Sequence, residues 1–261
     1  MAEMIQLSPA TQTDIRDAAD IIRGCRQGVV LTGAGLSTPS GIPDFRSTNS
    51  GLWERFDPAE VASLSTFRYH PEKFFAWIRP LVAQMAVAQP NIAHQSLAFL
   101  ETKGYLKTTI TQNIDGLHQK AGAKNVLEVH GSLETLTCVK CFSKLGSADY
   151  IAPLIEAGEI PHCPTCGGIL KPNLILFGEQ LPSRTWLTAQ EACRKADLMI
   201  IAGSSLEVLP VAGLPMRALE NGAHLIIINQ TQTYLDLRAD VVFREDVLDI
   251  LPRIVKEVAC D

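Results

Sequence analysis

Four cysteines in two C-x-x-C pairs constrain this chain more than any other feature of its sequence. Cys138/Cys141 and Cys163/Cys166 are separated by the 21 residues 142–162. Each pair brings two sulfur atoms to one side of a turn, so the two pairs supply the four ligands of a tetrahedral Zn²⁺ site. Because thiolates fill every coordination position, none is left for water, and we expect one structural zinc ion with no catalytic role.

Other interpretations of these cysteines are unrelated thiols, a redox dithiol, or a zinc ribbon that binds nucleic acid. The last is disfavoured because the basic side chains of the segment, Lys140, Lys144 and Lys171, do not cluster. The odd total of seven cysteines also differs from a secreted disulfide framework. The cysteine pattern therefore favours a reduced, cytoplasmic compartment.

Length and composition narrow the class of protein further. The 261 residues suffice for one large core with a smaller domain attached, and 46% apolar with 20% charged residues is typical of a folded chain. A net charge of −5 without a basic stripe argues against a sequence-specific nucleic-acid partner. No apolar run approaches the ~18 residues that cross a membrane, and no signal peptide is visible, so we expect no membrane partner.

Short apolar runs recur between helical stretches. They are Val29–Leu31, Leu106–Ile110, Val126–Val129, Leu198–Ala202, Leu225–Ile228 and Val241–Phe243. Continuous apolar runs are typical of parallel strands that are buried on both faces. Residues 14–27 show helical periodicity before the first run, with Gly28 as the expected stop. The pattern predicts an α/β protein with a Rossmann-type parallel sheet.

Two stretches interrupt this pattern. Residues 46–104 look mostly helical and are rich in aromatic side chains, whereas residues 135–172 contain both cysteine pairs and little apolar periodicity. We therefore expect a discontinuous Rossmann-type domain from residues 1–45, 105–134 and 173–261. The smaller domain would combine the helical module, 46–104, with the zinc-binding module, 135–172.

A glycine turn follows the first predicted strand. Gly33-Ala34-Gly35 can bring backbone N–H groups close to a pyrophosphate, but a tight turn without a ligand remains an alternative. Thr38 stands where the third glycine of G-x-G-x-x-G would be, and no acidic residue stands at the expected distance to hold a ribose. A hydride-transferring dehydrogenase is therefore poorly supported.

The glycine turn belongs to a longer run that resembles a known family. TGAGLSTPSGIPDFR at 32–46, TQNIDGLH at 111–118, LEVHG at 127–131, GSS at 203–205 and IN at 228–229 are similar to sirtuin motifs, in the same order. The zinc cysteines also fall where that family has them. The resemblance extends from about residue 20 to 255.

The resemblance implies an NAD-dependent protein lysine deacylase whose partners are acylated lysine peptides and proteins. In sirtuins the acyl oxygen attacks the nicotinamide-bearing ribose carbon, and nicotinamide leaves. A histidine then assists attack by a ribose hydroxyl, which yields free lysine and O-acyl-ADP-ribose. His130 matches that histidine, with Asn113 and Asp115 beneath the ribose; an imidazole, with an ordinary pKa of ~6.5, suits such a base. His118 is interpreted as structural.

The resemblance also assigns binding residues. Those expected to contact NAD are Gly33, Ala34, Gly35, Asp44, Phe45, Arg46, Gln112, Asn113, Asp115, Gly203, Ser204, Ser205, Asn229 and Val247. Those expected to contact the acylated peptide are Ile114, Ile175, Phe177, Gly178, Glu179, Glu207 and Val208. Phe45 would shield the reacting carbon from water.

Two positions of the helical module bear on the acyl group. Family members that prefer succinyl or malonyl groups place a tyrosine and an arginine where this chain has Ile78 and Leu81. A buried carboxylate without a partner is costly, so we expect apolar acyl groups to be preferred. Arg79 is a competing partner if the alignment shifts by one residue.

Two other functions remain open. A protein mono-ADP-ribosyltransferase would use the same NAD site with a different acceptor, and a non-enzymatic module would bind NAD or acyl-peptide without turnover. The complete set of Asn113, Asp115 and His130 favours deacylation over both.

Overall fold

The computed structural model describes residues 8–44 and 56–260. A six-stranded parallel sheet organises the larger part of the molecule, in the order β3-β2-β1-β7-β8-β9. The strands are β1 (Gly28–Thr32), β2 (Leu106–Thr111), β3 (Val126–Glu128), β7 (Leu198–Ala202), β8 (His224–Ile228) and β9 (Val241–Phe243). All six correspond to predicted runs, and the order is that of a Rossmann-type sheet.

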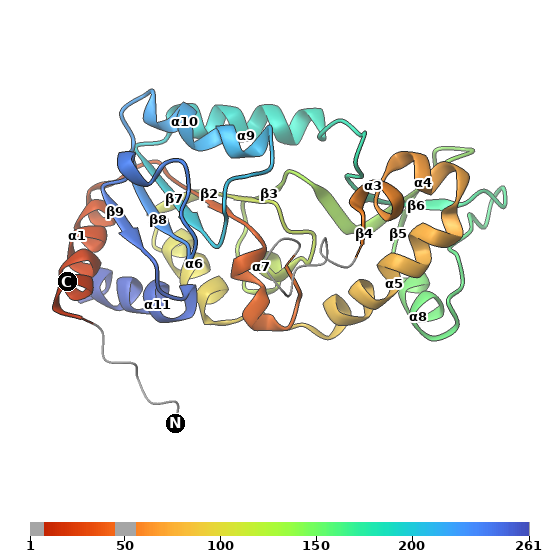
Figure 1. The fold of residues 1–261 in the computed structure, drawn as a ribbon, viewed down its shortest axis with the longest axis horizontal. Helices are drawn as coiled ribbons and strands as arrows, with labels where there is room; N and C mark the ends of the chain where they lie inside the picture. Colours follow the sequence, from red (N-terminus) through yellow and green to blue (C-terminus); the bar gives the residue numbers. More distant parts are fainter. Residues whose placement is uncertain (1–7, 45–55, 261) are drawn as a thin grey trace.

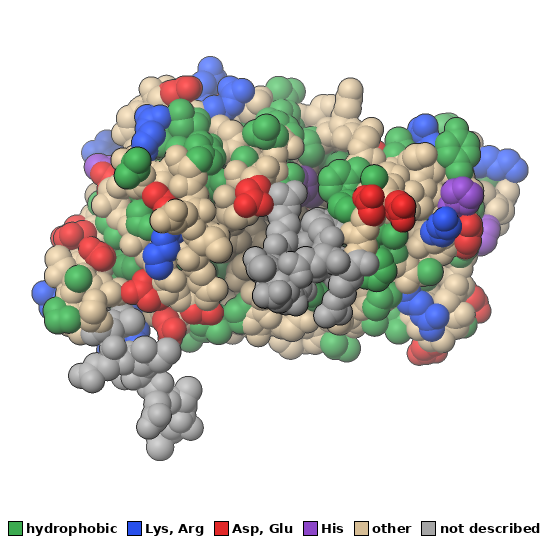
Figure 2. Space-filling view, in the orientation of Figure 1, with side chains coloured by type: hydrophobic (Ala, Val, Ile, Leu, Met, Phe, Trp, Pro, Cys, Tyr) green, Lys and Arg blue, Asp and Glu red, His purple; other side chains and the backbone are tan. Residues whose placement is uncertain are grey.

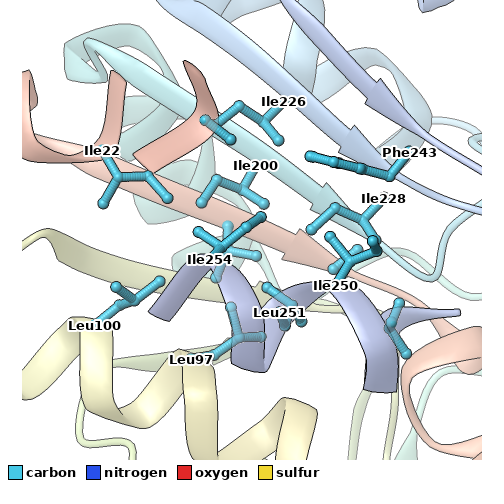
Figure 3. Close-up of a cluster of buried hydrophobic side chains, with 14 of the residues drawn as sticks. Ile22, Leu97, Leu100, Ile200, Ile226, Ile228, Phe243, Ile250, Leu251 and Ile254 are labelled. Carbon is cyan, nitrogen blue, oxygen red and sulfur yellow. The ribbon is translucent and has the colours of Figure 1, made fainter. Parts of the chain in front are cut away.

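Helices cover both faces of this sheet (Figure 1). On one face lie α1 (Pro9–Gly24), α6 (Ile92–Thr102) and α11 (Val247–Val258). On the other lie α9 (Ser183–Lys195) and α10 (Leu214–Leu219). Figure 3 shows strand side chains such as Ile200 and Ile226 directed at α6 and α11. Their neighbours Met199 and Ile201 face α9 and α10, so consecutive strand residues are all buried.

Three helices that cover the parallel sheet begin directly after a capping residue. Ser8 caps α1, Asn91 caps α6 and Asp246 caps α11, each with a side-chain oxygen that accepts a backbone N–H of the first turn. Helix α1 starts and ends earlier than the expected 14–27, and Gly28 is the first residue of β1, not a helix stop. A Cβ atom on Gly28 would lie 2.5 Å from the Tyr105 carbonyl oxygen, so close strand pairing requires this glycine.

The smaller part contains α3 (Pro58–Val61), α4 (Leu64–Tyr69), α5 (Pro71–Val87) and α8 (Ala148–Ala157). Phe67, Phe74 and Phe75 pack edge to face in its core. The expected helical module of 46–104 also contains α6, which packs against β2 and α11. The domain limits therefore remain a prediction.

A three-stranded antiparallel sheet completes the smaller part, in the order β5-β4-β6. It comprises β4 (Gly131–Cys138), β5 (Lys144–Gly146) and β6 (Leu170–Leu174). The apolar pattern did not predict these strands or α8. Within the described ranges, no helix is both long and apolar enough to cross a membrane.

Candidate active site

A cavity of about 1320 Å³ opens at the carboxyl ends of β1, β2, β7 and β8. Open α/β sheets bind ligands at this edge, where the strand order reverses. Every predicted cofactor- or peptide-binding residue within the described ranges lines this cavity, and so does His130. Phe45 and Arg46 lie outside the described residues.

Two glycine turns meet on one wall of the cavity. The Gly35 N–H donates to the Gly203 carbonyl oxygen at 3.0 Å, and the Gly33 N–H donates to that of Ala202 at 3.3 Å. A Cβ atom on Gly33 would lie 2.7 Å from the Gly203 oxygen, and one on Gly203, where φ is +63°, would lie 2.3 Å from the Leu36 nitrogen. These glycines are therefore required for the close approach of the two turns.

Three backbone N–H groups lie in or next to these turns and can serve as hydrogen-bond donors to a ligand. Among the described residues, the N–H groups of Ala34, Ser204 and Ser205 donate to no other backbone group. All three residues line the cavity. Clustered backbone N–H groups suit a pyrophosphate, so this wall fits a dinucleotide.

Asn113 and Asp115 are held by Ser37. The Asn113 amide donates to the Gly33 carbonyl oxygen at 2.9 Å and to Ser37 Oγ at 3.1 Å, and Ser37 Oγ donates to Asp115 Oδ2 at 2.7 Å. Asp115 Oδ1 also accepts the N–H of Leu117, the first residue of α7 (Leu117–Lys120). Ser37 lies inside the long glycine-containing motif, but the motif resemblance assigned it no role.

Two buried histidines lie behind this group. The rings of His94 and His118 meet edge to face at 5.0 Å. Burial lowers the pKa of His94 to about 4, against a partly opposing effect of Asp115, and lowers that of His118 to about 3. Thr32 donates its hydroxyl proton to Thr111, so its oxygen accepts from His118 Nε2. His118 is neutral, is absent from the cavity lining and fits the expected structural role.

His130 has a defined tautomer at the end of β3. Its Nδ1 atom lies 3.1 Å from the Gln112 carbonyl oxygen, which can only accept a hydrogen bond. The ring proton therefore sits on Nδ1, and Nε2 is the proton acceptor. Gly131 follows with φ +77°, and a Cβ atom there would lie 2.0 Å from the Asn173 oxygen. The turn that directs the chain from His130 into β4 therefore requires glycine.

Residues 174–179 form the opposite rim of the cavity. The Phe177 N–H donates to the Ala62 oxygen at 3.0 Å, and its own carbonyl oxygen accepts from the Leu64 N–H at 2.9 Å. One edge of this segment is therefore already paired. The Glu179 carboxylate accepts the Leu176 N–H and binds Lys171 Nζ, both at 2.9 Å, so internal contacts engage this side chain.

An apolar wall on α5 lies beneath this rim. Ile78, Leu81 and Met85 line the cavity, whereas Arg79 does not. Arg79 Nε instead donates to the Ile155 oxygen at 2.9 Å, and a terminal nitrogen donates to the Glu156 oxygen at 3.0 Å. Its guanidinium therefore caps the end of α8, away from the cavity.

The four cysteines of the C-x-x-C pairs converge, with all four sulfur atoms within 4.8 Å of one another. Cys138 and Cys166 Sγ are 3.4 Å apart, and Cys141 and Cys163 Sγ are 3.7 Å apart. Zn–S bonds of about 2.3 Å in a tetrahedron separate sulfur atoms by about 3.8 Å. A Cβ atom on Gly168 would lie 2.9 Å from Cys138 Sγ, so the turn requires glycine. The cluster fits one structural zinc ion.

The fold and site together define a Rossmann-type protein with a thiolate zinc module and a histidine at the cofactor edge of its sheet. The Sir2 family model matches residues 33–210, and the chain belongs to the Sir2 family. It is 43% identical to the "NAD-dependent protein deacylase 2" of Archaeoglobus fulgidus, over 95% of this chain and 97% of that protein. It is 40% identical to the "NAD-dependent protein deacetylase" of Thermotoga maritima, over 93% and 98%.

Solved structures of the same family superpose on nearly the whole chain. One, described under "Structural Basis for the Mechanism and Regulation of Sir2 Enzymes", has a TM-score of 0.88 at 43% identity and covers 95% of this chain and 98% of its own. Another, described as "Sir2-p53 peptide-NAD+", has a TM-score of 0.86 at 38% identity and covers 95% and 99%.

Proposed function

We propose that this chain is an NAD-dependent protein lysine deacylase that produces nicotinamide, free lysine and O-acyl-ADP-ribose. NAD would supply an electrophilic ribose carbon for the acyl oxygen and a ribose hydroxyl that accepts the acyl group, with one water molecule as the third reactant. The observation that carries the proposal is the position of His130. Its imidazole lines the same cavity as both glycine turns and residues 174–179, and its Nδ1 proton is bound to Gln112. In the neutral tautomer that this contact requires, Nε2 is the ring nitrogen that can accept a hydroxyl proton.

The other described cavity residues have complementary roles in this proposal. Gly33, Ala34 and Gly35 with Gly203, Ser204 and Ser205 would hold the pyrophosphate, and Asn229 and Val247 the adenosine half. Asn113 and Asp115, fixed by Ser37, would orient the nicotinamide ribose, next to Gln112 and Asp44. Phe45 and Arg46 retain the roles that the family resemblance implies.

The acylated peptide would lie between residues 174–179 and Glu207-Val208. Phe177 is already paired with Ala62 and Leu64, and Gly178, Glu207 and Val208 line the cavity, so the peptide backbone would lie between them. Ile114, Ile175 and Phe177 would surround the lysine stem. On the face drawn in Figure 2, described Asp and Glu side chains lie on both sides of the central region, and further Asp, Glu, Lys and Arg side chains are spread over the rest of this face.

We infer that apolar acyl groups are preferred over succinyl or malonyl groups. Ile78, Leu81 and Met85 give the cavity an apolar wall, and Arg79 is bound to the end of α8. Acetyl-lysine and succinyl-lysine peptides of one sequence should therefore differ in kcat/KM by at least about tenfold in favour of acetyl. Faster succinyl removal would contradict this preference. The double variant Ile78→Tyr/Leu81→Arg should narrow the difference.

Mass spectrometry of an acetyl-lysine peptide tests the whole proposal. With NAD the peptide should lose its acetyl group and O-acetyl-ADP-ribose should appear, whereas without NAD nothing should change. His130→Ala should slow the reaction by at least about 10²-fold, the usual contribution of a general base. Nicotinamide release from an unchanged peptide, with ADP-ribose attached to protein, would instead indicate a transferase.

A further inference from the structure

Two basic side chains without an assigned role bind the segments on opposite rims of the cavity. Lys171 lies in β6, and its side chain is 14% exposed. Arg244 follows β9, and its side chain is 34% exposed. Neither residue lines the cavity among the described residues. Each donates to two backbone carbonyl groups and to one carboxylate, and at least one of these acceptors belongs to a segment that lines the cavity.

Lys171 holds the segment 174–179. Its Nζ atom lies 3.1 Å from the Pro172 oxygen, 2.9 Å from the Leu174 oxygen and 2.9 Å from Glu179 Oε2. These contacts use all three ammonium hydrogens. Leu174 and Glu179 are the two ends of the segment, so one nitrogen atom binds both ends. Glu179 Oε2 also accepts the Leu176 N–H within the segment.

The other contacts of this segment leave a specific task for Lys171. Phe177 is paired with Ala62 and Leu64, and the Ile175 N–H donates to the His130 oxygen at 2.8 Å. These bonds fix the middle and the start of the segment. The Glu179 N–H donates to the Leu176 oxygen at 3.0 Å and closes the turn at Gly178, and the Lys171–Glu179 pair anchors this turn to β6 beside the cavity. Lys171 therefore determines the shape of the rim that would face the peptide.

Arg244 holds the opposite rim in the same way. One terminal nitrogen donates to the Asn229 and Thr231 oxygens, both at 2.8 Å, and the other forms an ion pair with Asp236. Asn229, Gln230 and Thr231 line the cavity directly after β8. Arg244 therefore determines the shape of the loop that would face the adenosine half of NAD.

We propose that Lys171 and Arg244 are positioning residues with separate effects, Lys171 on affinity for the acyl-lysine peptide and Arg244 on affinity for the cofactor. Each acts through a segment and touches neither ligand. This inference rests on the proposed function. Removing either cation leaves two carbonyl oxygens and a carboxylate without their charged donor, so the segment relaxes. The two segments lie on different rims, so each loss affects one ligand.

The test compares two affinities in matched variants. Lys171→Met and Arg244→Met keep the side-chain length roughly constant and remove the charge. Binding of an acetyl-lysine peptide alone and of ADP-ribose alone is measured by calorimetry, and KM for peptide and for NAD by steady-state kinetics. Lys195→Met and Arg194→Met are the controls, since both residues pair with Glu191 on the exposed surface of α9.

We expect Lys171→Met to weaken peptide binding by about tenfold or more while ADP-ribose binding changes by less than about twofold. Arg244→Met should show the reverse pattern, and Arg244→Lys should recover part of the loss because an ammonium still reaches carbonyl oxygens. The controls should change neither affinity. Equal weakening of both ligands in a variant that remains folded, or no change in either, would overturn the proposal.

A second variant guards against loss of the fold. Lys171→Met leaves the largely buried Glu179 carboxylate unpaired, which can destabilise the chain. The double variant Lys171→Met/Glu179→Gln removes both charges but keeps an oxygen for the Leu176 N–H, and it should also weaken peptide binding selectively. Zinc content and thermal unfolding report whether each variant is folded. A wild-type chain that leaves acetyl-lysine intact with NAD would refute the proposed function, independently of how the variants bind.

Discussion

At the scale of single residues, Glu128 carries an unusual carboxyl group two positions before His130. Its Oε1 atom is buried without a hydrogen-bond partner in the described structure. Burial raises the pKa of Glu128 to about 7; a hydrogen bond to Gln119 opposes this shift, and the Glu134 and Asp115 carboxylates add to it. The folded chain therefore binds this proton more tightly than the unfolded chain does.

Stability should depend on pH accordingly. An acid whose pKa rises from 4.5 to about 7 on folding favours the folded state fully below pH 4.5, and this contribution is lost as pH rises through 7. Glu128→Gln should thus raise the free energy of unfolding by about 1–2 kcal/mol at pH 8, allowing for partial solvent screening. It should change little at pH 4. Urea unfolding at both pH values measures this, and equal effects at the two values would contradict it.

Single residues also show where sequence reasoning stops. The family motifs lie at the ends of five strands, and every NAD-binding, peptide-binding and catalytic residue predicted from the resemblance lines one cavity where the structure describes it. The resemblance did not identify Ser37, Lys171 or Arg244, because their partners are carbonyl oxygens and carboxylates that only the folded chain brings near. The sequence motif predicts that Gly33 and Gly35 lie near a pyrophosphate. The structure shows a further reason for glycine at these positions, because a Cβ atom at either one would lie too close to Gly203.

At the scale of elements, the parallel strands were predictable and the antiparallel ones were not. β1, β7 and β8 are buried on both faces and stand out as apolar runs. β4 contains two threonines, a serine and a glutamate, and much of it is only half-buried. The cysteine cluster and contacts with β5 and β6 hold it in place, and an apolar pattern does not record these contacts.

The end of α8 provides a prediction about one element. Arg79 of α5 donates two hydrogen bonds to its last carbonyl oxygens, where the helix dipole also favours a cation. Arg79→Met should therefore lower the free energy of unfolding by about 1–2 kcal/mol in urea. The ratio of acetyl to succinyl turnover should stay constant, because Arg79 does not line the cavity. Arg68→Met, on the exposed side of α4, is the control, and a selective fall in succinyl turnover would refute this account.

At the scale of the whole molecule, the zinc cluster and the proposed base lie at opposite ends of one strand. β4 starts at Gly131, directly after His130, and ends at Cys138. β6 returns from the second cysteine pair to Leu174, and the Ile175 N–H then donates to the His130 oxygen. The six-stranded sheet, by contrast, has its own cores on both faces. A structural ion can therefore control a distant site in this molecule without stabilising the main sheet.

Removal of zinc should disorder the three-stranded sheet and leave the six-stranded sheet folded. Without the ion, the four thiol groups no longer hold the ends of β4 and β6, and the cluster around Leu136 and Leu170 is small. Hydrogen exchange should show loss of protection across residues 131–174, whereas β1, β7 and β8 stay protected. Deacylation should fall by at least about tenfold, because the backbone on both sides of His130 loses its support. Added Zn²⁺ should restore both signals, and Cys260→Ser, outside the cluster, should bind zinc as the wild type does. A zinc-free chain with undiminished turnover would show that β4 does not transmit order from the cysteines to His130.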